Sequence, residues 1–412
     1  MTVQSCPMRP EAIDTEFPWF PRPPIDLPEA YRWLQTNEPV RRVDLMGGQP
    51  GWLVTRYDDV RAVLADRRVS ADSQHPGFPR FGAPMEDPSQ RMFLRMDAPQ
   101  HTVFRKLLVR NFSRREAAAL EPRLEALVDE AIDQMLAAPD RQADFLSAIA
   151  LRVPSTVLSW ILGVHAEDRE FFNAAADRAL GATDLTNPDA LADAIVAIGE
   201  LREYIAGIAR ERAAQDDPGD DIIGQLVAAA KAGTITMADV ENSGILFVIA
   251  GHDTTTSMAA LGLHTLLGDR AQWEQVVADP SLVPGAVEEL LRYLTVVHLV
   301  VLRVASEDVE VGGVTIPAGE AIIPLNFAAN RDATRFADPD VFDIHRSEND
   351  HLAFGHGAHL CIGQTLARLE LNVIFRRLAE RVPTLRVTAP TEELPFKVYS
   401  GINGVSALPV AW

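Results

Sequence analysis

Cysteine is almost absent from this chain, and the shortage excludes one class of protein. Cys6 and Cys361 are the only cysteines among 412 residues, and they lie far apart in the sequence. Two isolated cysteines cannot build the disulfide framework of a small secreted domain. The first ten residues also lack the apolar core of a signal peptide. These shortages favour a protein of the reducing cytoplasm.

Basic charge and uninterrupted apolar runs are also scarce. The net charge of −20 argues against nucleic-acid binding, because that function needs a basic face. The most apolar run, residues 245–267, is interrupted by Gly251, His252 and Asp253. Since an unpaired aspartate is costly in hydrocarbon, we expect a buried helix of a soluble protein and no membrane partner.

The chain also lacks a linker and a nucleotide-binding fingerprint. No proline-, serine- or glycine-rich tract divides it, so residues 1–412 are expected to form a single domain. Residues 1–30 are rich in proline and are predicted to be an extended arm packed on the body. No G-x-G-x-x-G follows a strand pattern, so we expect no flavin or nicotinamide domain.

Periodicity predicts mostly helices with a few short strands. Helices are expected over 27–37 and 58–65, over about thirty residues from Thr236, and as a series over 117–212 punctuated by Pro122, Pro154 and Gly163. Strands are expected as a hairpin over 40–54, and over 295–303, 309–317, 320–324 and parts of 383–412. The proline- and glycine-rich residues 70–90 read as a long loop, which is usually functional at that length.

The run FGHGAHLCIG at 354–363 is chemically unusual. It holds three glycines, two histidines and Cys361, and a helical pattern begins at the cysteine. A thiol at a helix N-terminus lies beside unpaired backbone N–H groups, which favours the metal-binding thiolate.

Three interpretations of this run are open. A lone cysteine is by default a buried structural residue. His351, His356, His359 and Cys361 are also ligand types for zinc, although no second ligand pair lies far along the chain. The glycines further suggest that something flat or bulky approaches the backbone closely. A thiolate-ligated haem accounts for the cysteine and the glycines together.

The predicted long helix breaks its own pattern in the middle. Thr236 and Asp239 form a capping-box-like start, and Ala250–Thr255 follow about four turns later. Glycine, an acid and β-branched residues are poor helix formers, and a threonine hydroxyl can bond the carbonyl a turn earlier. A segment that departs from helix preference in this way is often functional. The alternative is a kinked core helix in which the Asp253 carboxylate has hydrogen-bond partners.

Four motifs, in this order, resemble those of the cytochrome P-450 superfamily. Residues 97–105 match D-x-P-x-H-x-x-x-R, 250–254 match [AG]-G-x-[DE]-T, 289–292 match E-x-x-R, and 354–363 match F-G-x-G-x-H-x-C-x-G at every fixed position. The resemblance covers the chain from about residue 15 and is greatest to soluble bacterial enzymes of actinomycete type. It implies a mainly α fold with a small β region, with haem b between the long central helix and the cysteine-bearing helix.

The resemblance also implies roles for individual residues. Cys361 is the expected axial ligand, Gly251 makes room for O₂, and Asp253 and Thr254 relay protons. The residues expected at the haem are His101, Arg105, Ala250, Arg303, Phe354, His359 and Gly363, with His101, Arg105, Arg303 and His359 at its propionates. The expected substrate pocket comprises Ile249, Val297, Leu299, Val300 and Ile402, and Glu289, Arg292 and Arg346 form a structural triad. No role is expected for His252, and His298 is open between a satisfied histidine and a substrate contact.

The expected function is monooxygenation of a hydrophobic small molecule, by hydroxylation or epoxidation with O₂. Oxidative coupling or desaturation is the nearest alternative, and a non-catalytic haem-binding protein is one from a different class. Residues 91–115 hold seven basic side chains and one acid, which suggests a docking patch for an acidic partner. A separate ferredoxin that supplies electrons fits this patch.

Overall fold

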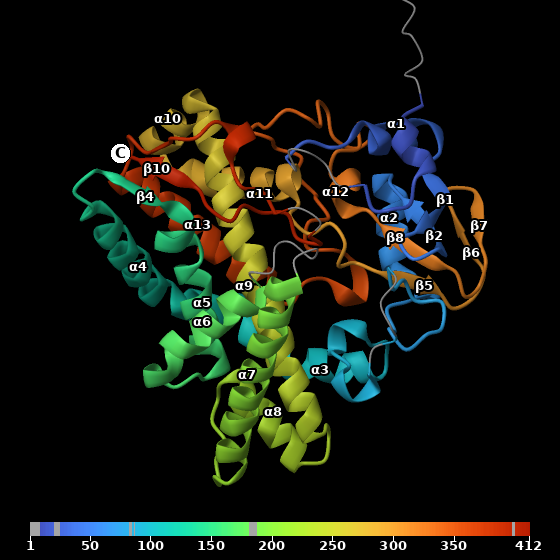
Figure 1. Cartoon of the computed structure of the whole chain (residues 1–412), viewed down its shortest axis with the longest axis horizontal. Helices are drawn as coiled ribbons and strands as arrows, with labels where there is room; N and C mark the ends of the chain where they lie inside the picture. The colour runs from blue at the N-terminus through green and yellow to red at the C-terminus, as the bar shows by residue number, and fades with distance from the viewer. Residues whose placement is uncertain (1–8, 20–24, 82–84, 86, 181–187, 398–399) are drawn as a thin grey trace, which may run out of the picture.

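Helices make up most of the fold. A computed structural model describes residues 9–19, 25–81, 85, 87–180, 188–397 and 400–412 (Figure 1). The α-helices are α1 (Glu29–Asn37), α2 (Tyr57–Ala65), α3 (Gln100–Leu108), α4 (Arg114–Leu136), α5 (Arg152–Leu162), α6 (Arg169–Leu180), α7 (Pro188–Ala213), α8 (Ile222–Lys231), α9 (Met237–Gly268), α10 (Arg270–Ala278), α11 (Val283–Leu294), α12 (Asn326–Ala329) and α13 (Gln364–Arg381). Within the described residues, no helix is long and apolar enough to cross a membrane.

Helix α9 is the axis around which the other helices pack. The predicted capping box is present: Thr236 accepts a hydrogen bond from the amide of Asp239, and the Asp239 carboxylate accepts one from the amide of Thr236. The helix runs through the middle of the molecule, with α5, α7, α11 and α13 packed against it (Figure 1). Because it is covered on several sides, it is apolar around much of its circumference, which is typical of a buried helix.

Most of the β structure lies to one side of the helical part, whereas β4 and β10 lie on the opposite side, near α10 and α13 (Figure 1). The main sheet has the strand order β1-β2-β8-β5-β3, and β6 pairs with β7 in a separate hairpin. A third sheet has the order β4-β10-β9. The strands are β1 (Val40–Leu45), β2 (Gln49–Val54), β3 (Val69–Ser70), β4 (Gln142–Asp144), β5 (Arg303–Ala305), β6 (Val309–Val311), β7 (Val314–Ile316), β8 (Ala321–Pro324), β9 (Arg386–Val387) and β10 (Pro409–Ala411).

The described part of the N-terminal arm packs on the main sheet. The side chain of Phe17 is fully buried, and its backbone bonds both Asp44 and Met46 at the end of the first hairpin. The arm thereby extends the second of three hydrophobic cores in the described part of the chain, which includes Tyr31 and Phe327. Residues 1–8 and 20–24 of the predicted arm lie outside the described residues.

Several sequence-based boundaries differ from the structure. Pro122 does not end a helix but lies inside α4, where packing and ion pairs with α13 outweigh the loss of one backbone hydrogen bond. Residues 295–302 form no strand, and only Arg303–Ala305 pair in the main sheet. Helix α13 begins at Gln364, three residues after Cys361, because Gly363 takes the N-cap position.

Candidate active site

A cavity of about 320 Å³ lies between α9 and the segment that contains Cys361. Its wall on α9 includes Ile249, Ala250, Gly251 and Thr254. Facing these residues are Phe354, Cys361 and Gly363. The cavity is lined mostly by apolar side chains, and its volume lies in the range of small-molecule sites. Segments far apart in the sequence therefore converge on one space.

Thr254 and Asp253 are adjacent in α9 but face different surroundings. Thr254 lines the cavity, and its Oγ donates a hydrogen bond to the carbonyl of Ala250 at 2.6 Å. Asp253 is buried and absent from the cavity wall, and its carboxylate is bonded by Lys397 and by Ser257. The bond from the threonine to the preceding turn is the one expected from the sequence. The carboxylate is satisfied, as in the structural alternative considered above.

Close packing and the nearby cavity explain why two positions of the Cys361 loop are glycines. Gly357 has φ +71°, and a Cβ there would lie 2.4 Å from the carbonyl oxygen of Leu64 in α2. This turn therefore seats the loop against α2, and the amide of Cys361 is fixed by the carbonyl of Phe354 at 2.9 Å. A Cβ on Gly363 would meet nothing closer than the Cys361 sulfur at 4.0 Å, so it would project into the cavity.

The Cys361 thiol is not activated in the way that the sequence suggested. Burial raises its pKa, and the backbone N–H groups of Gly363 and Gln364 and the charges of Arg105 and Arg368 only partly oppose this effect. The expectation that the helix terminus alone favours the thiolate is therefore wrong. A cation in the cavity would supply the missing stabilisation, since a coordinating metal deprotonates a thiol.

Four basic or histidine side chains form a cationic cluster at one edge of the cavity. His101, Arg105, Arg303 and His359 all line it, and the rings of His101 and His359 stack with centroids 4.0 Å apart. Burial, followed by the charge of Arg303, lowers the pKa of His359 to about 2, and burial lowers that of His101 to about 4. Asp97, the carboxylate that opposes these shifts at His101 and Arg303, is already bonded by Ser70 and by the amide of Ala71. The cluster is suited to an anionic group.

The family model for cytochrome P-450 matches residues 26–382. The chain belongs to the cytochrome P-450 family. It is 42% identical to vitamin D3 dihydroxylase of Streptomyces griseolus, covering 97% of this chain and 98% of that one. It is 39% identical to 20-oxo-5-O-mycaminosyltylactone 23-monooxygenase of Streptomyces fradiae, with 94% and 90% coverage. The crystal structure of cytochrome P-450 MoxA from Nonomuraea recticatena matches with a TM-score of 0.88 and 39% identity over 97% and 98% of the chains.

The predicted family, fold class and cofactor are confirmed by these comparisons. As a P-450 the protein is a monooxygenase, hence an oxidoreductase, with a thiolate-ligated haem. The residues present fit that cofactor. A thiol faces a largely apolar cavity, and a cationic cluster without a free carboxylate partner lies at its edge, where haem propionates need positive charge. The zinc interpretation fails: no metal-binding group of three or more His, Cys, Asp or Glu forms in the described part of the chain, and His351 is paired with Glu288.

The structure brings most of the sequence-predicted pocket residues of this P-450 together. Val297, Val300, Ile402 and Ile249 line the cavity, whereas Leu299 does not. Leu299 packs against the second core instead, because Gly401 pairs with the backbone at 298–299 and turns that side chain away from the cavity. The cavity wall also includes residues that the sequence did not single out, among them Leu158, Leu246, Phe247, Met258 and Glu370.

Two histidines left without a role in the sequence have structural partners. His298 stacks on Phe327 at 4.0 Å and contacts Asn403 at 3.0 Å, and it does not line the cavity. It is therefore the satisfied histidine of the two alternatives. His252 lies between α5 and α6, with Nδ1 2.9 Å from Ser155 and Nε2 2.9 Å from Asp177. The His252 Nε2 and Asp177 Oδ1 atoms are close together, but their geometry is not that of a hydrogen bond.

The predicted triad forms beneath the Cys361 loop. The Glu289 carboxylate accepts two bonds from Arg292 at 2.8 Å and one from Arg346 at 3.1 Å. The side chains of Glu289 and Arg292 are fully buried. None of the three lines the cavity.

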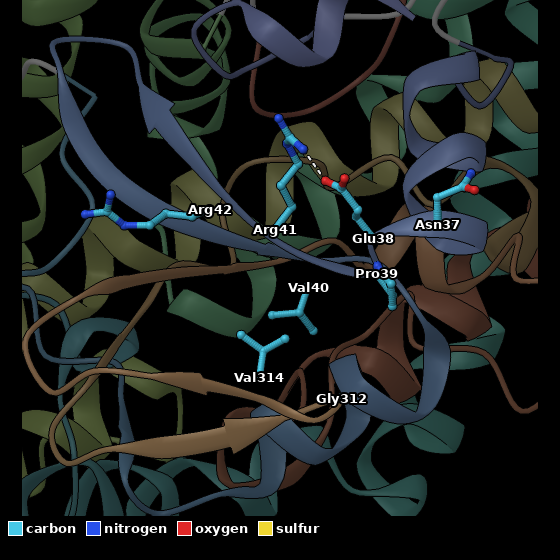
Figure 2. A pocket seen from close by; sticks show the side chains of 8 residues that line it. All are labelled: Asn37, Glu38, Pro39, Val40, Arg41, Arg42, Gly312 and Val314. Carbon is cyan, nitrogen blue, oxygen red and sulfur yellow. Dashed lines mark hydrogen bonds and ion pairs between the residues drawn. The ribbon is translucent and has the colours of Figure 1, made fainter. Parts of the chain in front are cut away.

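A second hollow is unsuited to the cofactor. It lies between the end of α1, strand β1 and the β6–β7 hairpin (Figure 2). Its volume of about 440 Å³ exceeds that of the cavity, but it is largely open to solvent. Its lining holds no cysteine or histidine, and Glu38 already pairs with Arg41 (Figure 2).

Proposed function

We propose that the protein inserts one oxygen atom from O₂ into a hydrophobic small molecule, with Cys361 as the haem ligand. The observation that carries this proposal is the position of the Cys361 thiol opposite Gly251 and Thr254 across one cavity. When bound, a thiolate-ligated haem supplies the electron density that favours O–O cleavage.

The remaining residues bind, orient and exclude water. His101, Arg105, Arg303 and His359 hold the propionates. Arg105 also donates to the carbonyl of Leu360 at 2.9 Å, so the same side chain links the propionate cluster to the Cys361 loop. Phe354 shields the sulfur side, with the Arg368 guanidinium 4.5 Å from its ring.

The α9 residues handle oxygen and protons. Gly251 leaves room for O₂ because it adds no side chain to the cavity wall, and Ala250 allows the cofactor to lie close to the helix. Thr254 presents its hydroxyl oxygen as a hydrogen-bond acceptor toward the cavity, since its proton is donated to Ala250. Asp253 carries protons from the solvent side to this point.

We propose a natural-product or xenobiotic substrate, oxidised by hydroxylation or epoxidation. The apolar wall made by Ile249, Val297, Val300 and Ile402 supports a hydrophobic molecule. The names of the two relatives point to the same class of substrate. Oxidative coupling or desaturation would use the same residues. A non-catalytic haem protein is disfavoured because it has no use for the proton delivery that the adjacent Asp253 and Thr254 would provide.

We further propose that residues 1–412 form one domain that works in the cytoplasm with a separate ferredoxin. Four of the seven basic residues over 91–115 are exposed, namely Lys106, Arg110, Arg114 and Arg115. The other three face inward: Arg91 pairs with Asp72, Arg95 lies by Arg303, and Arg105 lines the cavity. The four exposed residues, called the basic patch below, support docking of an acidic protein.

The absorbance spectrum of the dithionite-reduced protein with carbon monoxide tests the ligand assignment. We expect the long-wavelength Soret band of a thiolate-ligated haem, and its loss in Cys361→Ala and Cys361→His. Cys6→Ala is the matched control and should keep the band. Retention of the band in Cys361→Ala, or its absence in the wild-type holoprotein, would refute the assignment.

A further inference from the structure

The acid of the proposed relay is held away from the cavity. Asp253 is 8% exposed, and its Oδ1 accepts hydrogen bonds from Nζ of Lys397 and from Oγ of Ser257. Thr254 is engaged elsewhere, with Ala250. The two groups of the relay are therefore each bonded to a different partner in this structure.

Lys397 is an unusual choice for this chain. It is one of only three lysines among 38 basic residues, and the other two, Lys106 and Lys231, are exposed. The Lys397 side chain is 9% exposed. A buried cation needs a partner, and arginine would hold a carboxylate with a rigid, bidentate fork. An ammonium on a flexible stem makes a single point contact that is more easily broken.

The segment that carries Lys397 also touches the cavity. The amide of Lys397 donates to the carbonyl of Gly404 at 2.9 Å, and Phe396 bridges Val405. Ile402, between these paired ends, lines the cavity. Gly404 lies so close to α9 that a Cβ there would be 2.4 Å from Oγ of Ser257. The backbone at Gly404, which is paired with Lys397, is thus pressed directly against α9 one turn after Asp253.

We propose that Lys397 is a positioning residue that keeps Asp253 out of the relay until a molecule bound against Ile402 shifts the paired residues Gly404 and Lys397 and so releases the carboxylate. The released Asp253 takes a proton from water and gives it up on the Thr254 side, so its charge is restored after each transfer. Lys397 keeps its proton throughout. The inference rests on the proposed function and adds a dependence of proton delivery on cavity occupancy.

Lysine NMR tests the release directly. Holoenzyme labelled with ¹³C at lysine Cε should give three signals, and Lys397→Arg identifies the one from Lys397. We expect 4-phenylimidazole, an iron ligand that fills the cavity, to move this signal toward its position in Asp253→Asn. In Ile402→Ala the probe should produce the same Soret shift while the Lys397 signal stays in place. No movement in the wild type, or equal movement in Ile402→Ala, would overturn the proposal.

Electron use without substrate supplies the functional counterpart. With ferredoxin, its reductase and no substrate, Lys397→Met should consume nicotinamide at least threefold faster than the wild type, because Asp253 is always available. Lys397→Arg keeps the pair and should keep this consumption slow. Lys397→Met/Asp253→Asn leaves no unpaired buried charge and should return to the low value. An unchanged rate in Lys397→Met, or a raised rate in the double variant, contradicts the proposal. Failure of the proposed function would appear instead in the Cys361 spectra, which do not depend on Lys397.

Discussion

At the scale of single residues, the Thr254 hydroxyl separates productive from wasteful electron use. It is bonded to Ala250 at 2.6 Å and lines the cavity opposite Cys361. We expect Thr254→Ala to bind haem normally and to divert most electrons to peroxide, because the proton acceptor at that point is lost. The measurement is peroxide formed per nicotinamide consumed. Thr254→Ser keeps the hydroxyl and should largely restore coupling; if Thr254→Ala couples as well as the wild type, the relay is refuted.

The buried carboxyl group of Glu370 should make the stability of the protein depend on pH. Its carboxyl lines the cavity wall, is 4% exposed and has no hydrogen-bond partner at Oε2. Burial raises the pKa of Glu370 to about 8. The folded protein therefore keeps a proton that the unfolded chain loses above pH about 4.5. The stability contributed by this group is complete below that pH and falls as the pH rises to about 8.

Urea unfolding of holoprotein at several pH values between 5 and 8 measures this effect. Glu370→Gln cannot ionise, so its free energy of unfolding relative to the wild type should rise with pH, by up to about 1.4 kcal/mol per unit. Glu393→Gln, an exposed acid outside the cavity, should show no such trend. A difference between Glu370→Gln and the wild type that does not vary with pH would show that Glu370 ionises normally.

The sequence alone identified interactions between residues that are close in the chain. It did not identify interactions between residues that are far apart in the chain. The bond from Thr254 to Ala250 and the Glu289–Arg292 pair each join residues three or four positions apart. Lys397 and Asp253 are 144 residues apart, and nothing near either residue indicates the pair. The same holds for Leu299, whose orientation depends on pairing with Gly401.

At the scale of elements, α11 is joined to the segment after α12 by the triad. Glu289 also accepts bonds from the amide of Asp343 and from Asn349, and Arg292 donates to the carbonyls of Asn330, Pro339 and Val341. Because Glu289 and Arg292 are fully buried, removing one charge leaves the other uncompensated. We expect Glu289→Gln to lower the free energy of unfolding by about 3–5 kcal/mol.

Urea unfolding and haem retention on a desalting column measure this loss together. Glu274→Gln is the control, because its ion pair with Arg270 is exposed and should contribute at most about 1 kcal/mol. Equal effects of the two substitutions would show that the buried triad contributes no more to stability than an exposed ion pair.

Elements with strong local signals were predicted well, and elements held by packing were not. The capping box at Thr236 starts α9 where the sequence indicated, and strands β6 and β7 both lie in residues 309–317, where the sequence predicted strand structure. Helix α4 continues through Pro122 because α13 covers it, with Arg377 bonded to Asp129. Strand β4 lies in a region expected to be helical, since its only partner is β10, more than 260 residues later in the chain.

At the scale of the whole molecule, charge is distributed unevenly although the chain is acidic throughout. The basic patch lies on α3, the turn after it and the start of α4. Arg105 of the same helix donates to Leu360, the residue before Cys361. We therefore expect an acidic protein docked on the patch to lie close to the Cys361 loop.

Charge reversal on the patch should weaken this association and leave the chemistry intact. We expect Arg110→Glu/Arg114→Glu to raise the KM for an acidic ferredoxin at least about tenfold at low salt, with kcat at saturating ferredoxin nearly unchanged. The effect should shrink as salt is raised from 0.01 to 0.5 M, because exposed charges are screened. Arg42→Glu, an exposed arginine on β1, is the matched control and should behave as the wild type. If the two variants change the KM equally, net charge rather than the patch attracts the partner, and the docking proposal fails.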